Sequence, residues 1–175
     1  MKSPVLFYGL LGGLLISLLF LGPIVIAPGA YTEADQMVSS EIFGYSVMIL
    51  SMLTVYFGIR QSRNNNPDTR YSFGKGLITG LKITIVACAV FYLGNVLLYE
   101  VIAPDFLAEF SDYYLQNLIE NAGSEVERQK IMADFEATAF IIESSYAYAA
   151  LMSASALMIG LVISLISSLI LMRRS

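Results

Sequence analysis

Residues 60–75 read RQSRNNNPDTRYSFGK and form the one strongly basic, turn-rich stretch of a chain that is otherwise mostly apolar. The stretch holds four cations and a single acid: Arg60, Arg63, Arg70, Lys75 and Asp68. Short loops rich in lysine and arginine stay on the cytoplasmic side of a membrane. We therefore expect residues 60–75 to be a cytoplasmic loop that sets the orientation of the apolar segments on both sides of it.

The composition predicts one membrane domain, residues 1–175, with no cofactor. The apolar fraction of 57% exceeds the 45–50% or so that is usual for soluble domains. The only cysteine, Cys88, excludes a disulfide within one chain. The chain has no histidine, which is the commonest general base and metal ligand. It also carries no phosphate-binding loop, no nucleophile paired with a base and no nucleic-acid motif.

Four apolar segments are long enough to cross a hydrocarbon core of about 30 Å as helices. They predict membrane spans at residues 4–27, 42–60, 76–99 and 147–172. The first segment follows Lys2, as a signal peptide would. It is much longer than an h-region of about 7–15 residues, so we expect it to be a retained span.

Small residues recur at four-residue spacing in three of these spans. Such spacing lets the backbones of membrane helices approach closely. The first span carries Gly9 and Gly13, the third Gly76 and Gly80, and the last Ala156, Gly160, Ser164 and Ser168. We expect these positions to lie at helix–helix contacts.

Residues 104–140 are amphipathic rather than apolar. Apolar side chains recur there at helical spacing, at Leu107, Phe110, Tyr114 and Leu118. Ser124 and Glu127 have the spacing of a capping box that begins a second helix. We expect a helical hairpin outside the membrane whose apolar stripe is covered by lipid headgroups, by the spans or by a partner.

The predicted fold is therefore all-α: an integral-membrane four-helix transmembrane bundle with an extracytoplasmic amphipathic hairpin between spans three and four. With residues 60–75 inside, both termini lie in the cytoplasm. Most lysines and arginines then lie on or near the cytoplasmic side, with Arg128 and Lys130 outside, and Asp68 is the only acid inside. This charge distribution agrees with the positive-inside rule.

Polar residues within predicted spans are candidates for function. Lys82 lies roughly 10 Å from the cytoplasmic edge at about 1.5 Å per residue, so its amine can extend to the interface. Asn95 shares a helix face with Tyr92 and Tyr99, and we expect it to hydrogen-bond across to a neighbouring helix. Tyrosines near the predicted outer edge fit an aromatic belt: Tyr31, Tyr99, Tyr146 and Tyr148.

Three glutamates lie near the outer ends of the spans. Counting along the helices places Glu41 and Glu100 at similar depths and leaves Glu143 about 15 Å further out. A pair of carboxylates could bind a cation or carry out acid–base chemistry. We expect that Glu41 and Glu100 can be neighbours, whereas a site of all three acids is not expected.

Several local patterns carry a resemblance to a known family. They are Glu41-x-x-Gly44-Tyr45, Phe57-Gly58-Ile59-Arg60 with Arg63, Ser72-Phe73-Gly74-Lys75 with Gly80, Tyr92, Tyr99, Pro104-Asp105-Phe106, and the apolar run from Gly160 that ends in arginine. In these features nearly the whole chain resembles the domain of unknown function 4199 family. The resemblance implies a small four-span protein of the bacterial inner membrane with a helical insertion before the last span. It implies no activity, cofactor or catalytic residue.

Three functional hypotheses follow. The one we favour is a non-enzymatic protein of envelope assembly whose hairpin docks a membrane protein or a second copy of the chain. The second is a transporter or channel subunit for an ion or small solute, with a hydrated path reaching Lys82 or Asn95. The third is an enzyme acting on lipid or envelope substrates through Glu41 and Glu100. The candidate polar residues are Glu41, Tyr45, Lys82, Tyr92, Asn95, Tyr99 and Glu100.

Overall fold

The computed structural model describes residues 3–26, 37–65 and 71–172, without the side chains of residues 37–41. This described part is helical apart from short connections. Its helices are α1 (Pro4–Ile26), α2 (Met37–Asn64), α3 (Phe73–Leu97), α4 (Phe106–Glu120), α5 (Glu125–Glu143) and α6 (Ser145–Leu171). A short π-helix, η3 (Leu98–Ile102), continues α3.

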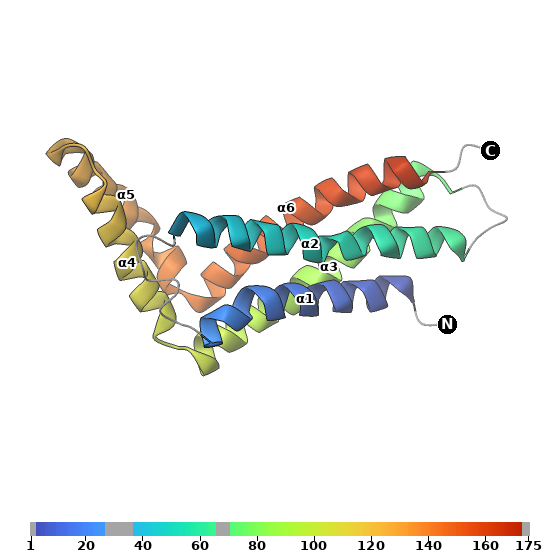
Figure 1. Cartoon of the computed structure of the whole chain (residues 1–175), viewed down its shortest axis with the longest axis horizontal. Coiled ribbons are helices and arrows are strands. Elements are labelled where there is room, and N and C mark those ends of the chain that lie inside the picture. The colour runs from blue at the N-terminus through green and yellow to red at the C-terminus, as the bar shows by residue number, and fades with distance from the viewer. Residues whose placement is uncertain (1–2, 27–36, 66–70, 173–175) are drawn as a thin grey trace.

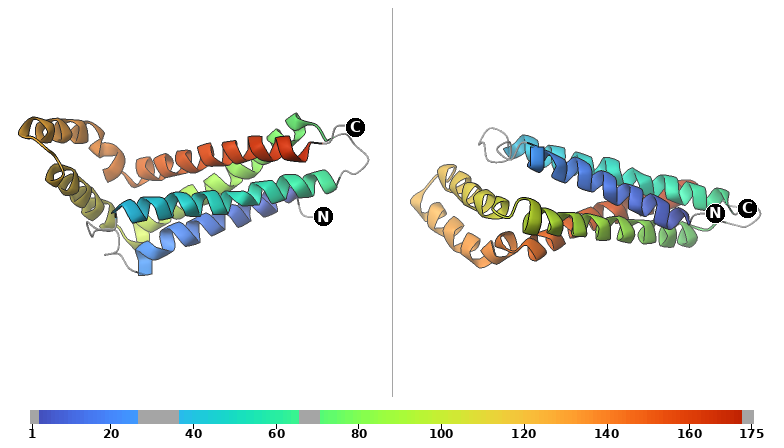
Figure 2. Two further views of the ribbon diagram at one scale, coloured as in Figure 1. Left: turned by 45° about the horizontal axis from the view of Figure 1, so that its top comes forward. Right: turned by 90° about the horizontal axis from the view of Figure 1, so that it is seen from below.

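Helices α1, α2, α3 and α6 lie side by side in an elongated bundle (Figure 1). Helices α1 and α3 run in one direction and α2 and α6 in the other, so the start of α1 and the end of α6, the two termini of the described chain, lie at one end. Helix α3 packs against α1, α2 and α6. At the opposite end α4 and α5 lie against each other and point away from the bundle, as Figure 2 also shows. We call residues 106–143, which form α4 and α5, the arm.

Within the described residues, four helices are long and apolar enough to cross a membrane: Pro4–Ile26, Ile42–Asn64, Phe73–Ile102 and Ser145–Leu171. The predicted all-α fold with four membrane-capable helices is therefore confirmed. Two of these helices extend into the basic stretch, because α2 continues to Asn64 and α3 begins at Phe73. Hydropathy marks the part of a helix that fits a membrane, and polar residues can extend the same helix beyond it.

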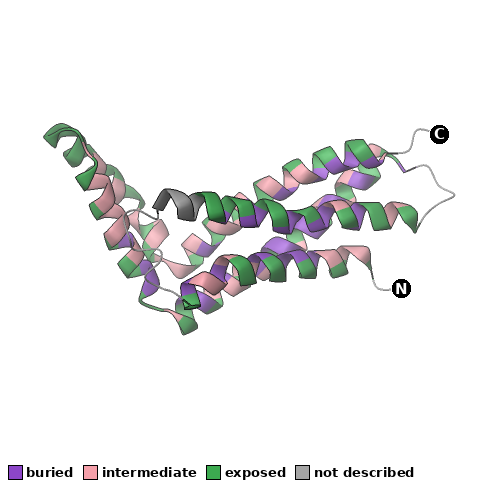
Figure 3. Ribbon diagram, viewed as in Figure 1, coloured by how far each residue is buried: buried purple, intermediate pink, exposed green. Residues whose placement is uncertain are grey.

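The outer surface of the bundle is apolar. Figure 3 shows buried residues along the inward sides of the helices and exposed residues along their outward sides. Large apolar side chains are among the exposed ones, including Leu18, Leu93 and Ile170. So much exposed apolar area is unusual on a soluble protein, and contact with lipid accounts for it in a multi-pass membrane protein.

The small-residue stripe of α6 lies at the contact with α3. All four of its residues are buried: Ala156, Gly160, Ser164 and Ser168. A Cβ atom at Gly80 would lie 2.7 Å from Ser164 Oγ, and one at Gly76 would lie 2.9 Å from Ser168 Oγ. The positions that the spacing predicted as helix–helix contacts are therefore where α3 and α6 meet.

Glycines also bring α1 close to α3. A Cβ atom at Gly9 would lie 2.6 Å from Val86 Cβ. One at Gly13 would lie 2.6 Å from Val90 Cβ and 2.8 Å from the carbonyl oxygen of Ala87. A backbone carbonyl cannot rotate away from such a clash, so a side chain at Gly13 would have to push the helices apart.

Hydroxyl groups in this interface satisfy their hydrogen-bonding needs within their own helices. Thr84 Oγ1 donates to the Gly80 carbonyl at 3.0 Å, and Ser164 Oγ donates to the Gly160 carbonyl at 2.7 Å. This pattern lets a small polar side chain lie in an apolar interface without an unpaired donor. The stripe therefore supports close van der Waals packing rather than hydrogen bonds between helices.

The second helix of the arm begins as the sequence predicts. Ser124 Oγ accepts a hydrogen bond from the Glu127 backbone N–H at 3.2 Å. The Glu127 carboxylate accepts one from the backbone N–H of Gly123 at 2.9 Å, one residue before the position used in a standard capping box. These two bonds fix the turn between α4 and α5.

The glycine contacts predict that Gly13→Ala lowers the melting temperature of the protein in detergent, whereas Gly74→Ala does not. A Cβ atom at Gly74 meets nothing within 4 Å, and alanine is favoured over glycine in a helix by about 0.5–1 kcal/mol. Overpacking at Gly13 costs about 1–3 kcal/mol. Thermal unfolding of both variants checks this, and equal melting temperatures would contradict the close packing of α1 on α3.

Candidate functional site

Lys82 and Asn95, proposed together for a transport path, have different surroundings in α3. Lys82 is exposed, whereas Asn95 is completely buried, with 0% of its surface exposed. An exposed lysine near the end of a span fits a side chain whose amine extends to the interface. The two residues therefore do not share one environment.

The predicted bond from Asn95 to another helix is wrong. Its Nδ2 atom donates to the Phe91 carbonyl of its own helix at 2.8 Å. Its Oδ1 atom is buried and has no hydrogen-bond partner among the described residues. Packing of α3 against its neighbours is already close through glycines, so Asn95 turns back to its own backbone. Its neighbours on that face are Tyr92, which is half-buried, and Tyr99, which is buried.

The acidic candidates do not form a described site. Glu100 is exposed on η3. Glu41 belongs to α2, but its side chain lies outside the described part of the structure. Among the described residues, no group of three or more acids or cysteines could hold a metal ion.

The apolar stripe of α4, the predicted partner surface, is covered in part by the chain itself. Leu107 is 4% exposed, and Phe110 packs against the core. Tyr114 and Leu118 are half-buried. The sequence left open whether lipid headgroups, the spans or a partner cover this stripe. In the structure the bundle covers the first turns of α4, so Leu107 and Phe110 anchor the arm.

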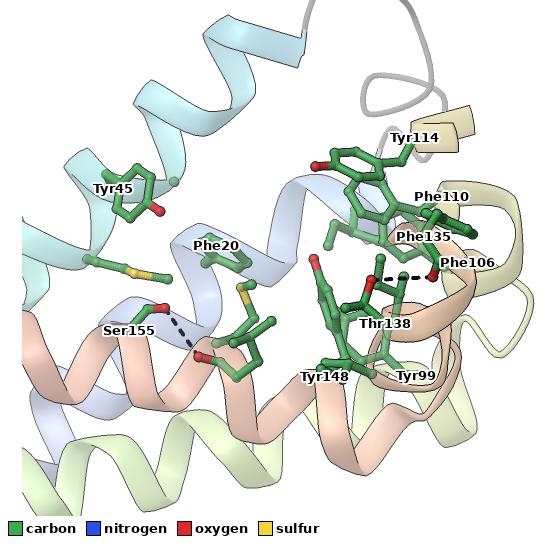
Figure 4. A pocket seen from close by; sticks show the side chains of 17 residues that line it. Phe20, Tyr45, Tyr99, Phe106, Phe110, Tyr114, Phe135, Thr138, Tyr148 and Ser155 are labelled. Atoms are coloured by element: carbon green, nitrogen blue, oxygen red, sulfur yellow. Dashed lines mark hydrogen bonds between the residues drawn. The ribbon is translucent and has the colours of Figure 1, made fainter. Parts of the chain in front are cut away.

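A cavity of about 490 Å³ opens between the arm and the bundle (Figure 4). Helices α1, α2, α4, α5 and α6 and the π-helix η3 all contribute to its wall. Its lining is Phe20, Ile24, Gly44, Tyr45, Met48, Tyr99, Phe106, Phe110, Tyr114, Phe135, Thr138, Ile141, Ile142, Tyr148, Leu151, Met152 and Ser155. The cavity brings together two of the candidate polar residues, Tyr45 and Tyr99, and two of the predicted partner surface, Phe110 and Tyr114.

Aromatic rings form one side of the cavity. Each ring stacks nearly parallel on the next in the order Tyr99, Phe106, Phe110 and Tyr114. The centroids of successive rings are 5.9, 6.0 and 6.1 Å apart. Tyr148 of α6 meets Tyr99 edge to face at 5.6 Å. Residues four apart on a helix lie on one face, so the recurrence of aromatics at 106, 110 and 114 was the sequence signal for this wall.

The polar groups of the cavity are hydroxyls rather than charges. Among its described lining residues there is no aspartate, glutamate, lysine or arginine. Thr138 Oγ1 donates to the Asp134 carbonyl at 3.0 Å, and Ser155 Oγ donates to the Leu151 carbonyl at 3.2 Å. The lining therefore offers hydrogen bonds and apolar contact but no carboxylate or amine for acid–base chemistry.

The cavity extends across the edge of the membrane-capable part of the bundle. Along α6, Ser155 lies about 24 Å from Leu171 and Tyr148 about 35 Å, at about 1.5 Å per residue. Two residues after Leu171 the sequence has the basic Arg173 and Arg174, which suit a membrane edge. In a hydrocarbon core about 30 Å thick, Ser155 would lie among acyl chains and Tyr148 at the interface.

The chain belongs to the family described as protein of unknown function (DUF4199), which it matches over residues 7–173. The resemblance expected from the sequence is thereby confirmed. The chain has no significant match among curated proteins or among solved structures. Its function must therefore be argued from the cavity and the arm.

Burial of the arm's anchor predicts that Leu107→Glu destabilises the protein. An unpaired carboxylate in place of this buried side chain costs about 3–5 kcal/mol, so the melting temperature in detergent falls and proteases cut sooner at the turn between α4 and α5. Val126→Glu is the matched control, because Val126 is 79% exposed on the same arm. Equal stability of the two variants would contradict the anchoring of α4 on the bundle.

Proposed function

We propose that this multi-pass membrane protein binds a lipid-like ligand in the cavity between the arm and the bundle. The observation that carries the proposal is the uncharged, aromatic and aliphatic lining of that cavity. A volume of about 490 Å³ falls within the roughly 300–1,000 Å³ of small-molecule sites. An apolar ligand gains free energy by leaving water for such a lining.

The position of the cavity supports a ligand that comes from the bilayer. Phe20, Met48 and Ser155 line the part that belongs to the bundle, whereas Phe135 and Thr138 line the part that belongs to the arm. A hydrocarbon chain can then lie beside the spans while its polar end lies near the interface. No charged residue of the described lining has to be desolvated for such a ligand to bind.

The proposed setting is the bacterial inner membrane, with both termini and the basic stretch in the cytoplasm. The ends of α2 and α6 and the start of α3 lie at the termini end of the bundle. Arg60 and Arg63 lie at that end of α2 and Lys75 at the start of α3, which supports this orientation by the positive-inside rule. The cavity and the arm would then be on the outer side.

The other two hypotheses gain less support. A transport path through Lys82 and Asn95 would have to join an exposed side chain to a fully buried one. The enzyme hypothesis depends on Glu41 and Glu100, but Glu100 is exposed on η3 and the described lining of the cavity has no carboxylate. Binding without chemistry is the simpler use of this site.

The envelope-assembly role is the second candidate function, and α5 favours it. No residue of α5 is buried, and both Val126 and Phe140 are large apolar side chains more than half exposed beyond the spans. The partner we propose for this face is another membrane protein of the envelope. The anchoring residues of α4 would hold the arm in place for it.

Filling the cavity should weaken ligand binding. The chain has no tryptophan, so Phe135→Trp introduces a single fluorescent reporter in the lining, and 1-bromododecane serves as a headless hydrocarbon probe. Quenching of the tryptophan by 1-bromododecane should be saturable. Ser155→Phe should weaken binding of the probe at least about tenfold, a loss of about 1.4 kcal/mol of binding free energy. Ala154→Phe, on an exposed neighbouring position, should leave it unchanged.

Two results would contradict the proposed function. One is quenching that does not saturate, as expected for simple partition at a lipid-facing reporter such as Leu93→Trp, where Leu93 is 65% exposed. The other is an unchanged curve in Ser155→Phe. Thr138→Phe tests the same cavity from the arm, with the exposed Ala137→Phe as its control.

The second candidate has its own test. A photo-crosslinking side chain at Phe140 should give one discrete protein adduct in intact cells, because this position is exposed on the arm beyond the spans. The same group at Leu93 is the control for contact with lipid. Loss of the adduct in Val126→Glu would support docking at α5, whereas crosslinks to lipid alone at Phe140 would contradict it.

A further inference from the structure

We infer that the ligand of this cavity is an uncharged lipid whose head group carries carbonyl oxygens, held by the hydroxyls of Tyr45, Tyr114 and Tyr148. The inference rests on the proposed function and names the ligand class of the same site. It follows from the direction of these hydroxyls, from the lack of charge around them and from the hydrogen bonds already made by their neighbours.

Three tyrosines from three different helices line the cavity. Tyr45 belongs to α2, Tyr114 to α4 and Tyr148 to α6. Figure 4 shows their hydroxyl ends facing the space between the arm and the bundle. In the described part of the chain, no residue hydrogen-bonds to any of the three hydroxyls. Tyr114 and Tyr148 are half-buried and Tyr45 is 57% exposed. A tyrosine hydroxyl that becomes buried usually takes a hydrogen-bond partner, and a ligand that covers these three side chains can supply it.

The other hydroxyls of the cavity cannot take the place of these donors. The protons of Thr138 and Ser155 are directed to backbone carbonyls of their own helices. Both oxygens can still accept hydrogen bonds, but neither has a second proton to donate. The donors available to a ligand are therefore the tyrosines, and they match a head group with several acceptor oxygens.

Charge selects against phospholipids. A phosphate in the cavity would lose much of its hydration, and the described lining has no lysine or arginine to pair with it. An unpaired buried charge costs several kcal/mol. A neutral head group avoids this cost, and its carbonyl oxygens can accept from the tyrosines.

Two lipids share the required chemistry of a neutral head, two carbonyl groups and hydrocarbon tails. One is a quinone with an isoprenoid tail, whose flat ring can also stack on the aromatic wall. The other is a diacylglycerol with its two ester carbonyls. Both dissolve in the bilayer and can enter from the side of the spans.

The test uses the Phe135→Trp reporter with four probes: a benzoquinone with an isoprenoid tail, brominated diacylglycerol, brominated phosphatidylglycerol and headless 1-bromododecane. At least one neutral carbonyl probe should bind at least about tenfold more tightly than phosphatidylglycerol. The triple variant Tyr45→Phe, Tyr114→Phe, Tyr148→Phe should weaken that binding by roughly tenfold to a thousandfold, since each of the three lost hydrogen bonds contributes about twofold to tenfold. Its binding of 1-bromododecane should stay unchanged.

Tyr146→Phe is the matched control, because Tyr146 is as exposed as Tyr45, 57% each, but does not line the cavity. Native mass spectrometry of lipid adducts on the chain without the tryptophan reporter repeats the comparison. Preference for the quinone or for the diacylglycerol identifies the source, and either supports the inference. Tight phosphatidylglycerol binding, or no effect of the triple variant, overturns the inference. If 1-bromododecane still binds saturably in that case, the proposed function stands. Absence of saturable binding for every probe overturns both.

Discussion

The close approach of α3 to α1 and α6 is the constraint on which the rest of the structure depends. In a bilayer, helices gain little from hiding apolar surface from one another, because lipid is apolar too. Dense van der Waals contact must hold them, and this requires small residues where backbones meet. Gly13 against the Ala87 carbonyl and Gly80 against Ser164 supply that contact on two sides of α3. These contacts make α3 the fixed element of the bundle.

The path of the chain from α3 through η3 to α4 follows from the fixed position of α3. Its π-helical continuation keeps Tyr99 in the core, 2% exposed, while the chain turns out toward α4. Tyr99 then stacks with Phe106 and meets Tyr148 edge to face. Aromatic contacts thus join the bundle to the arm where glycine contacts no longer do. Because rings are larger than glycines, the helices cannot close on one another at this end, and space for a ligand is left between them.

The sequence predicts the bundle better than the site, for a physical reason. Span length and the small residues of α6 are periodic signals within one helix, and all four stripe positions are buried as expected. Which surface covers an amphipathic helix is not a local property, so the helical spacing predicts Leu107 as part of a partner surface although the bundle buries it. The apolar runs also do not predict the helix ends within residues 60–75, since polar residues continue a helix beyond its apolar part. Tyr148 fitted an aromatic belt, and only the fold places it opposite Tyr114 in one cavity.

The cavity and the exposed arm are physically linked through α5. This helix has no buried residue, and its half-buried side chains Phe135, Ile141 and Ile142 face the cavity. An apolar ligand would add contacts to that face and none to the exposed face that carries Val126 and Phe140. A ligand stabilises whichever arrangement of the protein it binds best. A ligand that stabilises the present arrangement of the arm would also keep Val126 and Phe140 exposed, because it contacts the other face of α5. Lipid binding and partner docking would therefore use different faces of α5 and would not compete for one surface.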